Sequence, residues 1–322
     1  MAQSECGYLQ GLCPITMAKL KHNKLIRLIF FGNYFYGLCA VALSIEANLQ
    51  QRYPLNSLLF YVMSFSATVL YYSKAYIMTE VSDDHANLRS MWYVRNRKAM
   101  QKTQLFFMIC LSACTIYFIS QHYGNILHVT LNEWFLIFLF PLVSAFYYGV
   151  DNSYFGHHNL RNIGWLKPFI IGFTWAGLVN IYPVLFYCID TGTHYAPDLV
   201  SLFLFIKNFM YITMLCILFD VKDYAMDYNQ DLKTVVVKLG LRKTIFYFII
   251  PLVIIGLTSF LAYALHNHFS IGKMVINTIP FLLALMVAYS MYNRRSIFYY
   301  LIVIDGLMLV KAFCGSIAMS YF

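Results

Sequence analysis

Nine apolar segments, each long enough to cross a lipid bilayer, constrain this chain more than any other feature. A transmembrane helix needs about 20 mostly apolar residues, because the hydrocarbon core is about 30 Å thick and offers no partner to a free backbone polar group. The segments lie at approximately 25–47, 55–78, 104–121, 132–150, 168–189, 199–219, 244–265, 272–292 and 297–320. The sequence therefore predicts an all-α, polytopic membrane protein in which residues 1–322 form a single transmembrane domain of nine helices.

The composition excludes the soluble classes of protein. Of the 322 residues, 60% are hydrophobic and only 11% are charged, whereas soluble domains have about 25% charged residues. The net charge of +9 does not indicate nucleic-acid binding, because the cations lie in short loops and form no basic stripe with interleaved aromatic residues. We therefore expect a protein that contacts membrane lipid and has no nucleic-acid partner.

Lysine and arginine are concentrated in alternate loops. They flank the first apolar segment and follow the second, fourth, sixth and eighth, whereas the loops on the other side carry only Arg52 and Lys273. By the positive-inside rule, the basic loops are cytoplasmic. The sequence predicts an integral protein of the cytoplasmic (inner) membrane, with a cytoplasmic N-terminus, an external C-terminus and no cleaved signal peptide.

An acidic run follows the sixth segment. The stretch DVKDYAMDYNQDLKT, residues 220–234, holds four of the chain's 14 acidic residues: Asp220, Asp223, Asp227 and Asp231. On a helix, at about 100° per residue, all four fall within an arc of about 80°. Neighbouring carboxylates about 6 Å apart repel by about 3 kcal/mol at an effective dielectric of about 20. A bound divalent cation would offset this repulsion, and a solvated helix cap is the open alternative.

A second acidic cluster lies at the predicted cytoplasmic end of the second segment. Glu80 and Asp84 are four residues apart and share a helical face, with Asp83 adjacent. Both clusters are expected on one side of the membrane, close to Arg89 and to the RNRK run at 95–98. Carboxylates that face one cavity beside cations are typical of a site for a magnesium-bridged diphosphate. Attraction to anionic lipid explains the RNRK run equally well.

These motifs resemble those of the UbiA-type intramembrane prenyltransferases. The run at 220–240, DVKDYAMDYNQDLKTVVVKLG, is similar to the second aspartate-rich motif of that family, and Tyr76, Glu80 and Asp84 can be laid on its first motif. Tyr76 stands where the first motif has Asn, Glu80 where it has Asp, and Asp231 where the second motif has Gly. The resemblance implies a nine-helix bundle with both motifs on the cytoplasmic side.

The resemblance also implies an activity. Members of this family transfer a prenyl group from an isoprenoid diphosphate to a lipophilic or aromatic acceptor, with Mg²⁺ neutralising the leaving group next to a chamber lined by aromatic side chains. The implied metal ligands, which are also the implied catalytic residues, are Glu80, Asp84, Asp220, Asp223 and Asp227. The implied substrate-binding residues are Lys74, Arg89, Lys222 and Asp231. The site would lie between two cytoplasmic loops, at about 80–103 and 220–243.

Two alternatives of other classes stay open because the first motif departs from the family's pattern. One is a catalytically inactive UbiA-like scaffold or lipid-binding protein, and the other is a cation-coupled transporter. Polar residues inside the apolar segments also need partners, because an unpaired charge in the bilayer is costly. We expect Lys207 to pair with Asp305 or to line a cavity, and Lys311 to pair with Asp305. Asn33 is expected to form an interhelical hydrogen bond.

Overall fold

The described part of the chain consists of helices and the turns between them. The computed structural model describes residues 24–78, 88–148, 163–229, 233–291 and 299–321, and no strand occurs in these ranges. The helices of the first half are α2 (Lys24–Phe31), α3 (Tyr34–Gln50), α4 (Leu58–Met78), α5 (Leu88–Arg95), α6 (Arg97–Gln121), α7 (Tyr123–Leu127) and α8 (Leu131–Tyr148). Those of the second half are α9 (Lys167–Ala176), η3 (Gly177–Ile181), α10 (Tyr182–Thr191), α11 (Leu199–Asn229), α12 (Val235–Thr244), η4 (Ile245–Ile249), α13 (Ile250–His266), α14 (Ile271–Ser290), η5 (Tyr300–Ile304) and α16 (Gly306–Tyr321).

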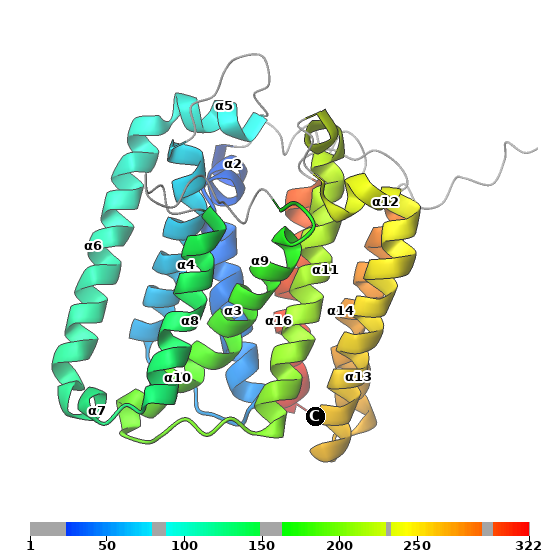
Figure 1. Cartoon of the computed structure of the whole chain (residues 1–322). Helices are drawn as coiled ribbons and strands as arrows, with labels where there is room; N and C mark the ends of the chain where they lie inside the picture. Colours follow the sequence, from blue (N-terminus) through cyan, green and yellow to red (C-terminus); the bar gives the residue numbers. More distant parts are fainter. Residues whose placement is uncertain (1–23, 79–87, 149–162, 230–232, 292–298, 322) are drawn as a thin grey trace, which may run out of the picture.

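The helices form a bundle with two distinct ends (Figure 1). We call the end at which α2, α5 and α12 lie the α5 end, and the opposite end, where α7 lies, the α7 end. The described chain begins with α2 at the α5 end and finishes with α16 at the α7 end. It therefore starts and stops on opposite faces of the bundle, as an odd number of crossings requires.

Six helical stretches are long and apolar enough to cross a membrane among the residues described. They are Arg97–Gln121, Lys167–Thr191, Leu199–Val221, Val235–His266, Ile271–Ser290 and Tyr300–Tyr321. The bent pair of α2 and α3 adds a seventh if it is counted as one span. The prediction of an all-α chain with several candidate membrane spans is confirmed. Helices α4 and α8 coincide with the second and fourth predicted segments but lie outside this set.

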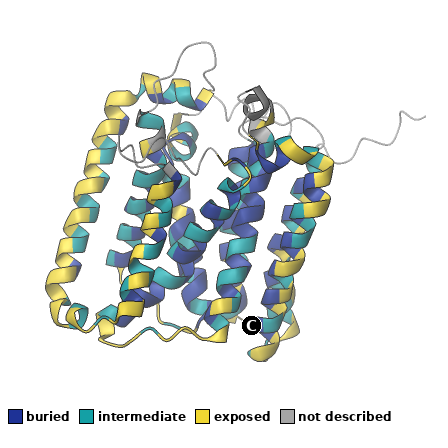
Figure 2. Cartoon of the chain, viewed as in Figure 1, coloured by how far each residue is buried: buried dark blue, intermediate teal, exposed yellow. Residues whose placement is uncertain are grey.

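Helix α11 lies in the core of the bundle, and α6 lies on its outside (Figure 2). Of the residues in the apolar stretch of α11, 56% are buried, whereas only 6% of those in the apolar stretch of α6 are buried. Buried side chains of α11, such as Tyr211, Ile212 and Leu215, pack in one cluster with residues of α3, α13 and α16. The outer face of α6 exposes large apolar side chains, including Phe106 and Ile116, as expected of a surface in contact with lipid rather than water.

The first predicted segment is bent rather than straight. Helices α2 and α3 meet at an angle of 61°, and the bend falls at Gly32 and Asn33. Asn33 has a left-handed backbone conformation, with φ of 65°, which a regular helix does not contain. Helix α2 therefore lies obliquely at the α5 end, with α5 beside it, while α3 runs through the bundle (Figure 1).

Candidate functional site

The acidic run lies on a continuous helix at the α5 end. The apolar stretch of α11 ends at Val221, but the helix continues to Asn229. Positions 220, 223 and 227 are three and four residues apart on this helix, so their backbone positions share one face, as predicted. The structure describes the side chain of Asp220 but not those of Lys222, Asp223 and Asp227, and Asp231 lies outside the described residues.

Asp220 forms an ion pair with a lysine that the sequence did not single out. The Nζ atom of Lys167, at the start of α9, donates to Oδ1 of Asp220 over 2.8 Å. The Asp220 side chain is only 4% exposed and that of Lys167 is 25% exposed, so the pair is well shielded from solvent. Lys167 therefore supplies part of the positive charge that the acidic run requires.

Two further residues of the run at 220–240 have local structural roles. The Thr234 side chain accepts a hydrogen bond from the Val237 amide over 3.3 Å and thereby caps α12. Gly240 has φ of 75°, a conformation that glycine adopts without the steric penalty of a Cβ atom. The part of the run that follows the aspartates thus sets the turn into α12 and α13.

The predicted first cluster is described only in part. Glu80 and Asp84 lie outside the described residues. Lys74, in the last turns of α4, is exposed. The ring of Tyr76, one half-turn further on, stacks on Tyr93 of α5 with ring centroids 4.9 Å apart.

Arg89 is buried and holds the bend between α2 and α3. Its guanidinium donates to the carbonyl oxygens of Phe30 and Phe31, over 3.2 and 3.3 Å, and also to the Asn33 side chain. These carbonyls are the ones that the end of α2 leaves without helical partners. The guanidinium also lies 4.4 Å from the centre of the Tyr76 ring. Burial lowers the pKa of Arg89, but neighbouring tyrosines and Asp305 together raise it by more, so the side chain stays charged.

The Asn33 prediction is confirmed, because this side chain joins three helical elements. Its Nδ2 atom donates to Ser73 of α4 over 3.2 Å and to Tyr93 of α5 over 2.9 Å. Together with Arg89, it fixes the position of α5 against α2 and α3.

The predicted metal site stays a prediction. Within the described part of the chain, no three His, Cys, Asp or Glu side chains come together. Of the five predicted ligands, only Asp220 has a side chain that the structure describes. The side chains of the other four lie outside the described part: Glu80, Asp84, Asp223 and Asp227.

An aromatic layer lies inside the bundle close to the α5 end, formed by Tyr36, Tyr72 and Trp175. The rings of Tyr36 and Tyr72 stack with centroids 4.7 Å apart, and the Trp175 indole donates to the Tyr72 hydroxyl over 2.6 Å. Asp305 accepts a hydrogen bond from the Tyr36 hydroxyl over 2.7 Å. The layer thus brings together α3, α4 and α9 and combines aromatic faces with one buried carboxylate.

A second polar centre, the Glu46 cluster, lies deep in the bundle and consists of Glu46, Lys207 and Lys311. Lys311 donates to Oε2 of Glu46 over 2.6 Å, and Nζ of Lys207 lies 3.5 Å from Oε1. Lys207 also donates to the Gln50 side chain over 2.7 Å. All three charged residues are at most 3% exposed. The cluster therefore joins α3, α11 and α16 through charges that are out of contact with solvent.

The expected pairing of Lys311 with Asp305 is wrong, and so is the first of the two expectations for Lys207, that it pairs with Asp305. Both lysines contact Glu46, because α3 packs against α16 and the Glu46 side chain also reaches Lys207 of α11, whereas Asp305 binds Tyr36. Glu46 was missed, although an acidic residue within the segment 25–47 is a signal that the sequence contains. Lys167 was missed because its partner is 53 residues away and nothing local indicates the pairing.

Fold and site together define a helical membrane bundle with a charged, partly acidic end and a buried ionic centre. Comparison of the chain with protein-family models, with curated proteins and with solved structures found no match.

Proposed function

We propose that the chain is a nine-span membrane prenyltransferase, which transfers a prenyl group from an isoprenoid diphosphate to a lipophilic or aromatic acceptor in a magnesium-dependent reaction. The observation that carries the proposal is the continuation of α11 as a helix to Asn229. This continuation supports the view that the three aspartates of the D-x-x-D-x-x-x-D pattern at 220–227 lie on one face of a helix at the α5 end, rather than in an irregular loop. The resemblance to the UbiA-type family gives the reaction class.

The donor chemistry of this face suits Mg²⁺, which prefers carboxylate oxygens. Asp223, Asp227, Glu80 and Asp84 would hold the ion together with Asp220, whose Oδ1 atom also accepts a hydrogen bond from Lys167. When bound, Mg²⁺ supplies the positive charge that lets the diphosphate leave. Lys74, Lys222 and Asp231 are proposed to position the substrate.

The aromatic layer of Tyr36, Tyr72 and Trp175 supports the same proposal. Loss of diphosphate leaves an allylic carbocation, and the faces of aromatic rings attract cations. The three side chains come from α3, α4 and α9, and the hydrogen bond between Trp175 and Tyr72 fixes their mutual position. A rigid aromatic wall of this kind can stabilise developing positive charge while water is excluded.

The proposal predicts a selective loss of activity in carboxamide variants. Asp223→Asn and Asp227→Asn preserve side-chain shape but remove a charge, so either should lower magnesium-dependent diphosphate release by about 100-fold, which corresponds to about 3 kcal/mol. The measurement is diphosphate release by purified protein with a panel of isoprenoid diphosphates. Asp190→Asn, at the end of α10 next to the α7 end, is the matched control and should retain full turnover.

A second candidate function is a UbiA-like scaffold or lipid-binding protein without catalysis. Two observations favour it: Asp220 is paired with Lys167, and Arg89 is held by the backbone of α2. Both residues are thereby used in the fold. If no diphosphate is released, and if Mg²⁺ with diphosphate does not raise the thermal stability of the wild-type protein, the prenyltransferase proposal is wrong and the scaffold is favoured.

A further inference from the structure

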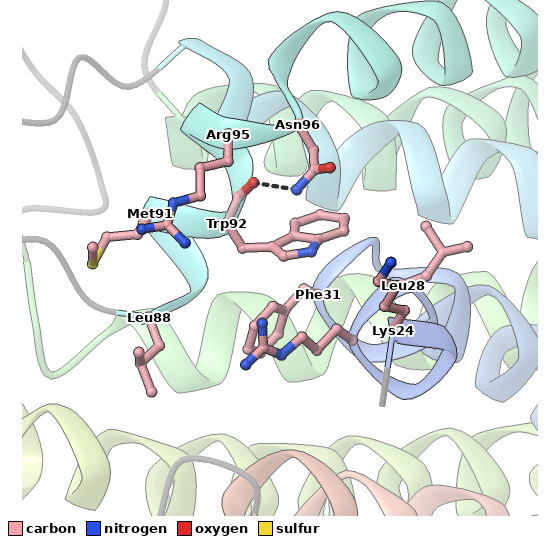
Figure 3. A pocket seen from close by; sticks show the side chains of 9 residues that line it. Lys24, Leu28, Phe31, Leu88, Met91, Trp92, Arg95 and Asn96 are labelled. Carbon is pink, nitrogen blue, oxygen red and sulfur yellow. Dashed lines mark hydrogen bonds between the residues drawn. The ribbon is translucent and has the colours of Figure 1, made fainter. Parts of the chain in front are cut away.

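A cavity of about 550 Å³ opens between α2 and α5 at the α5 end. Figure 3 shows its lining from close by. The side chains that line it are Lys24, Arg27, Leu28, Phe31, Leu88, Met91, Trp92, Arg95 and Asn96. Its volume lies within the range of about 300–1,000 Å³ that is typical of sites for small organic ligands.

The polar part of the lining is cationic. Lys24 and Arg27 come from α2 and Arg95 from the last turn of α5, and none of the lining residues is acidic. Lys24 and Arg95 are exposed, so an anion can reach both of them from the aqueous side. The Asn96 side chain, which is uncharged, donates to the Trp92 carbonyl over 2.8 Å. The charged groups of the lining are therefore all cations.

The remainder of the lining is apolar. Phe31 is buried, and its ring packs edge-on against Trp92 with centroids 5.9 Å apart. Leu28, Leu88 and Met91 are 38–46% exposed, which is a high exposure for three large apolar side chains around one cavity. An occupant that removes them from water is therefore stabilised by the hydrophobic effect.

The two walls of the cavity are fixed relative to each other. Arg89 of α5 donates to the carbonyl oxygens of Phe30 and Phe31 at the end of α2, so hydrogen bonds join the two helices that line the cavity. A preformed site loses less conformational entropy when it binds a ligand. Helix α5 lies across the end of the bundle (Figure 1).

We propose that this cavity binds one anionic phospholipid. The phosphate lies among Lys24, Arg27 and Arg95, and an acyl chain covers Leu28, Met91 and Trp92. Charge complementarity selects an anionic headgroup over a zwitterionic one, because each basic residue near the surface attracts an anionic lipid by about 1 kcal/mol. Inorganic phosphate would contact the cations but would leave the apolar part of the lining uncovered. The proposal goes beyond prenyl transfer and does not depend on it.

The test is lipid binding to the purified full chain in detergent, measured by native mass spectrometry with phosphatidylglycerol and with phosphatidylcholine. We expect phosphatidylglycerol to bind about tenfold more tightly or better. The double variant Lys24→Gln and Arg95→Gln should weaken its binding by about 30-fold. The matched control is Arg97→Gln with Lys98→Gln, which removes two exposed charges next to the cavity but not from its lining.

A second pair of variants tests the acyl chain. Met91→Ser, in the lining, should weaken phosphatidylglycerol binding by about tenfold, whereas Val94→Ser, exposed on the same helix but outside the cavity, should not. All the substituted side chains are exposed, so folding should be retained.

Three results would overturn the proposal. An equal loss in the Arg97 and Lys98 control would show general charge attraction rather than a site. Binding of glycerol phosphate as tight as that of the whole lipid would exclude an acyl-chain contact. Displacement of phosphatidylglycerol by an equimolar isoprenoid diphosphate would assign the cavity to that ligand instead.

Discussion

The buried cluster of Glu46, Lys207 and Lys311 contains two residues that can be positively charged and one that can be negatively charged. Its single carboxylate uses one oxygen for each lysine, and Gln50 adds hydrogen bonds to both Glu46 and Lys207. Removing one partner of a buried ion pair is strongly destabilising, because the other charge stays buried without compensation. Glu46 is therefore the residue on which the cluster depends most.

We predict that Glu46→Gln lowers the free energy of unfolding by about 3–5 kcal/mol. The carboxamide cannot neutralise Lys207 or Lys311, so each buried amine would either stay charged without a counter-ion or lose its proton, and both outcomes cost free energy. Lys207→Met should cost clearly less, because it leaves one lysine and one glutamate that are still paired through the 2.6 Å contact. The measurement is unfolding by titration with sodium dodecyl sulfate. Equal losses for the two variants would contradict this account.

At the scale of the helices, α3 and α16 approach each other closely at Gly315. A Cβ atom on this residue would lie 2.5 and 2.6 Å from the Cγ and Cδ atoms of Glu46. Glycine is therefore required here for the carboxylate to reach both lysines, and small residues at such crossings are common in membrane bundles.

Gly315→Ala should destabilise the bundle by about 1–3 kcal/mol, because the methyl group forces Glu46 away from its partners. Gly306→Ala is the matched control on the same helix, since a Cβ atom there meets nothing within 4 Å. It should be neutral or stabilising by up to about 1 kcal/mol, because alanine favours the helix. Thermal unfolding in detergent compares the two variants, and a similar loss in both would show that the effect arises from helix propensity rather than from contact with Glu46.

The sequence was sufficient to locate the long apolar helices, but not all of their ends. It did not predict the short helices α5, α7 and α12, two of which lie in segments that were expected to be loops. Each of the nine predicted segments coincides with helical structure, because apolar length is a local property of the chain. The prediction ended the sixth segment at 219, whereas α11 continues to Asn229, since polar residues can extend a helix beyond the membrane. The bend at Asn33 was not predicted, because it depends on Arg89, 56 residues further along the chain.

The same distinction applies to the candidate site. The shared face of positions 220, 223 and 227 follows from helical periodicity and could be predicted. The partners of the charged residues could not, because they come from distant helices: Lys207 is 161 residues from Glu46, and Lys167 is 53 residues from Asp220. Hydropathy shows that a charge lies inside the membrane, but only the packing of the bundle decides which other charge it meets.

For the molecule as a whole, the number of crossings depends on α4 and α8. At 1.5 Å per residue, the 21 residues of α4 extend about 32 Å and the 18 of α8 about 27 Å, close to the thickness of the hydrocarbon core. Polar residues lower the mean hydropathy of α4. Ser64, Ser66, Thr68 and Ser73 are buried in the bundle, whereas Lys74, in the last turns of the helix, is exposed. Both helices are therefore long enough to cross the hydrocarbon core.

If α4 and α8 both cross the membrane, the loops that flank them must alternate between its two faces. Single cysteines at Leu55 and Tyr123 should react with a membrane-impermeant maleimide from outside intact cells. Cysteines at Lys98 and Trp165 should react only after the cells are opened, because the basic α5 end is predicted to be cytoplasmic. All four side chains are exposed in the structure, so failure to react would not result from burial within the protein. The protein with its native cysteines provides the blank.

Labelling at positions 55 and 98 from the same side would show that α4 does not cross the membrane. Labelling at positions 123 and 165 from the same side would show that α8 does not cross it. Either outcome would contradict the nine-span bundle on which the proposed function depends.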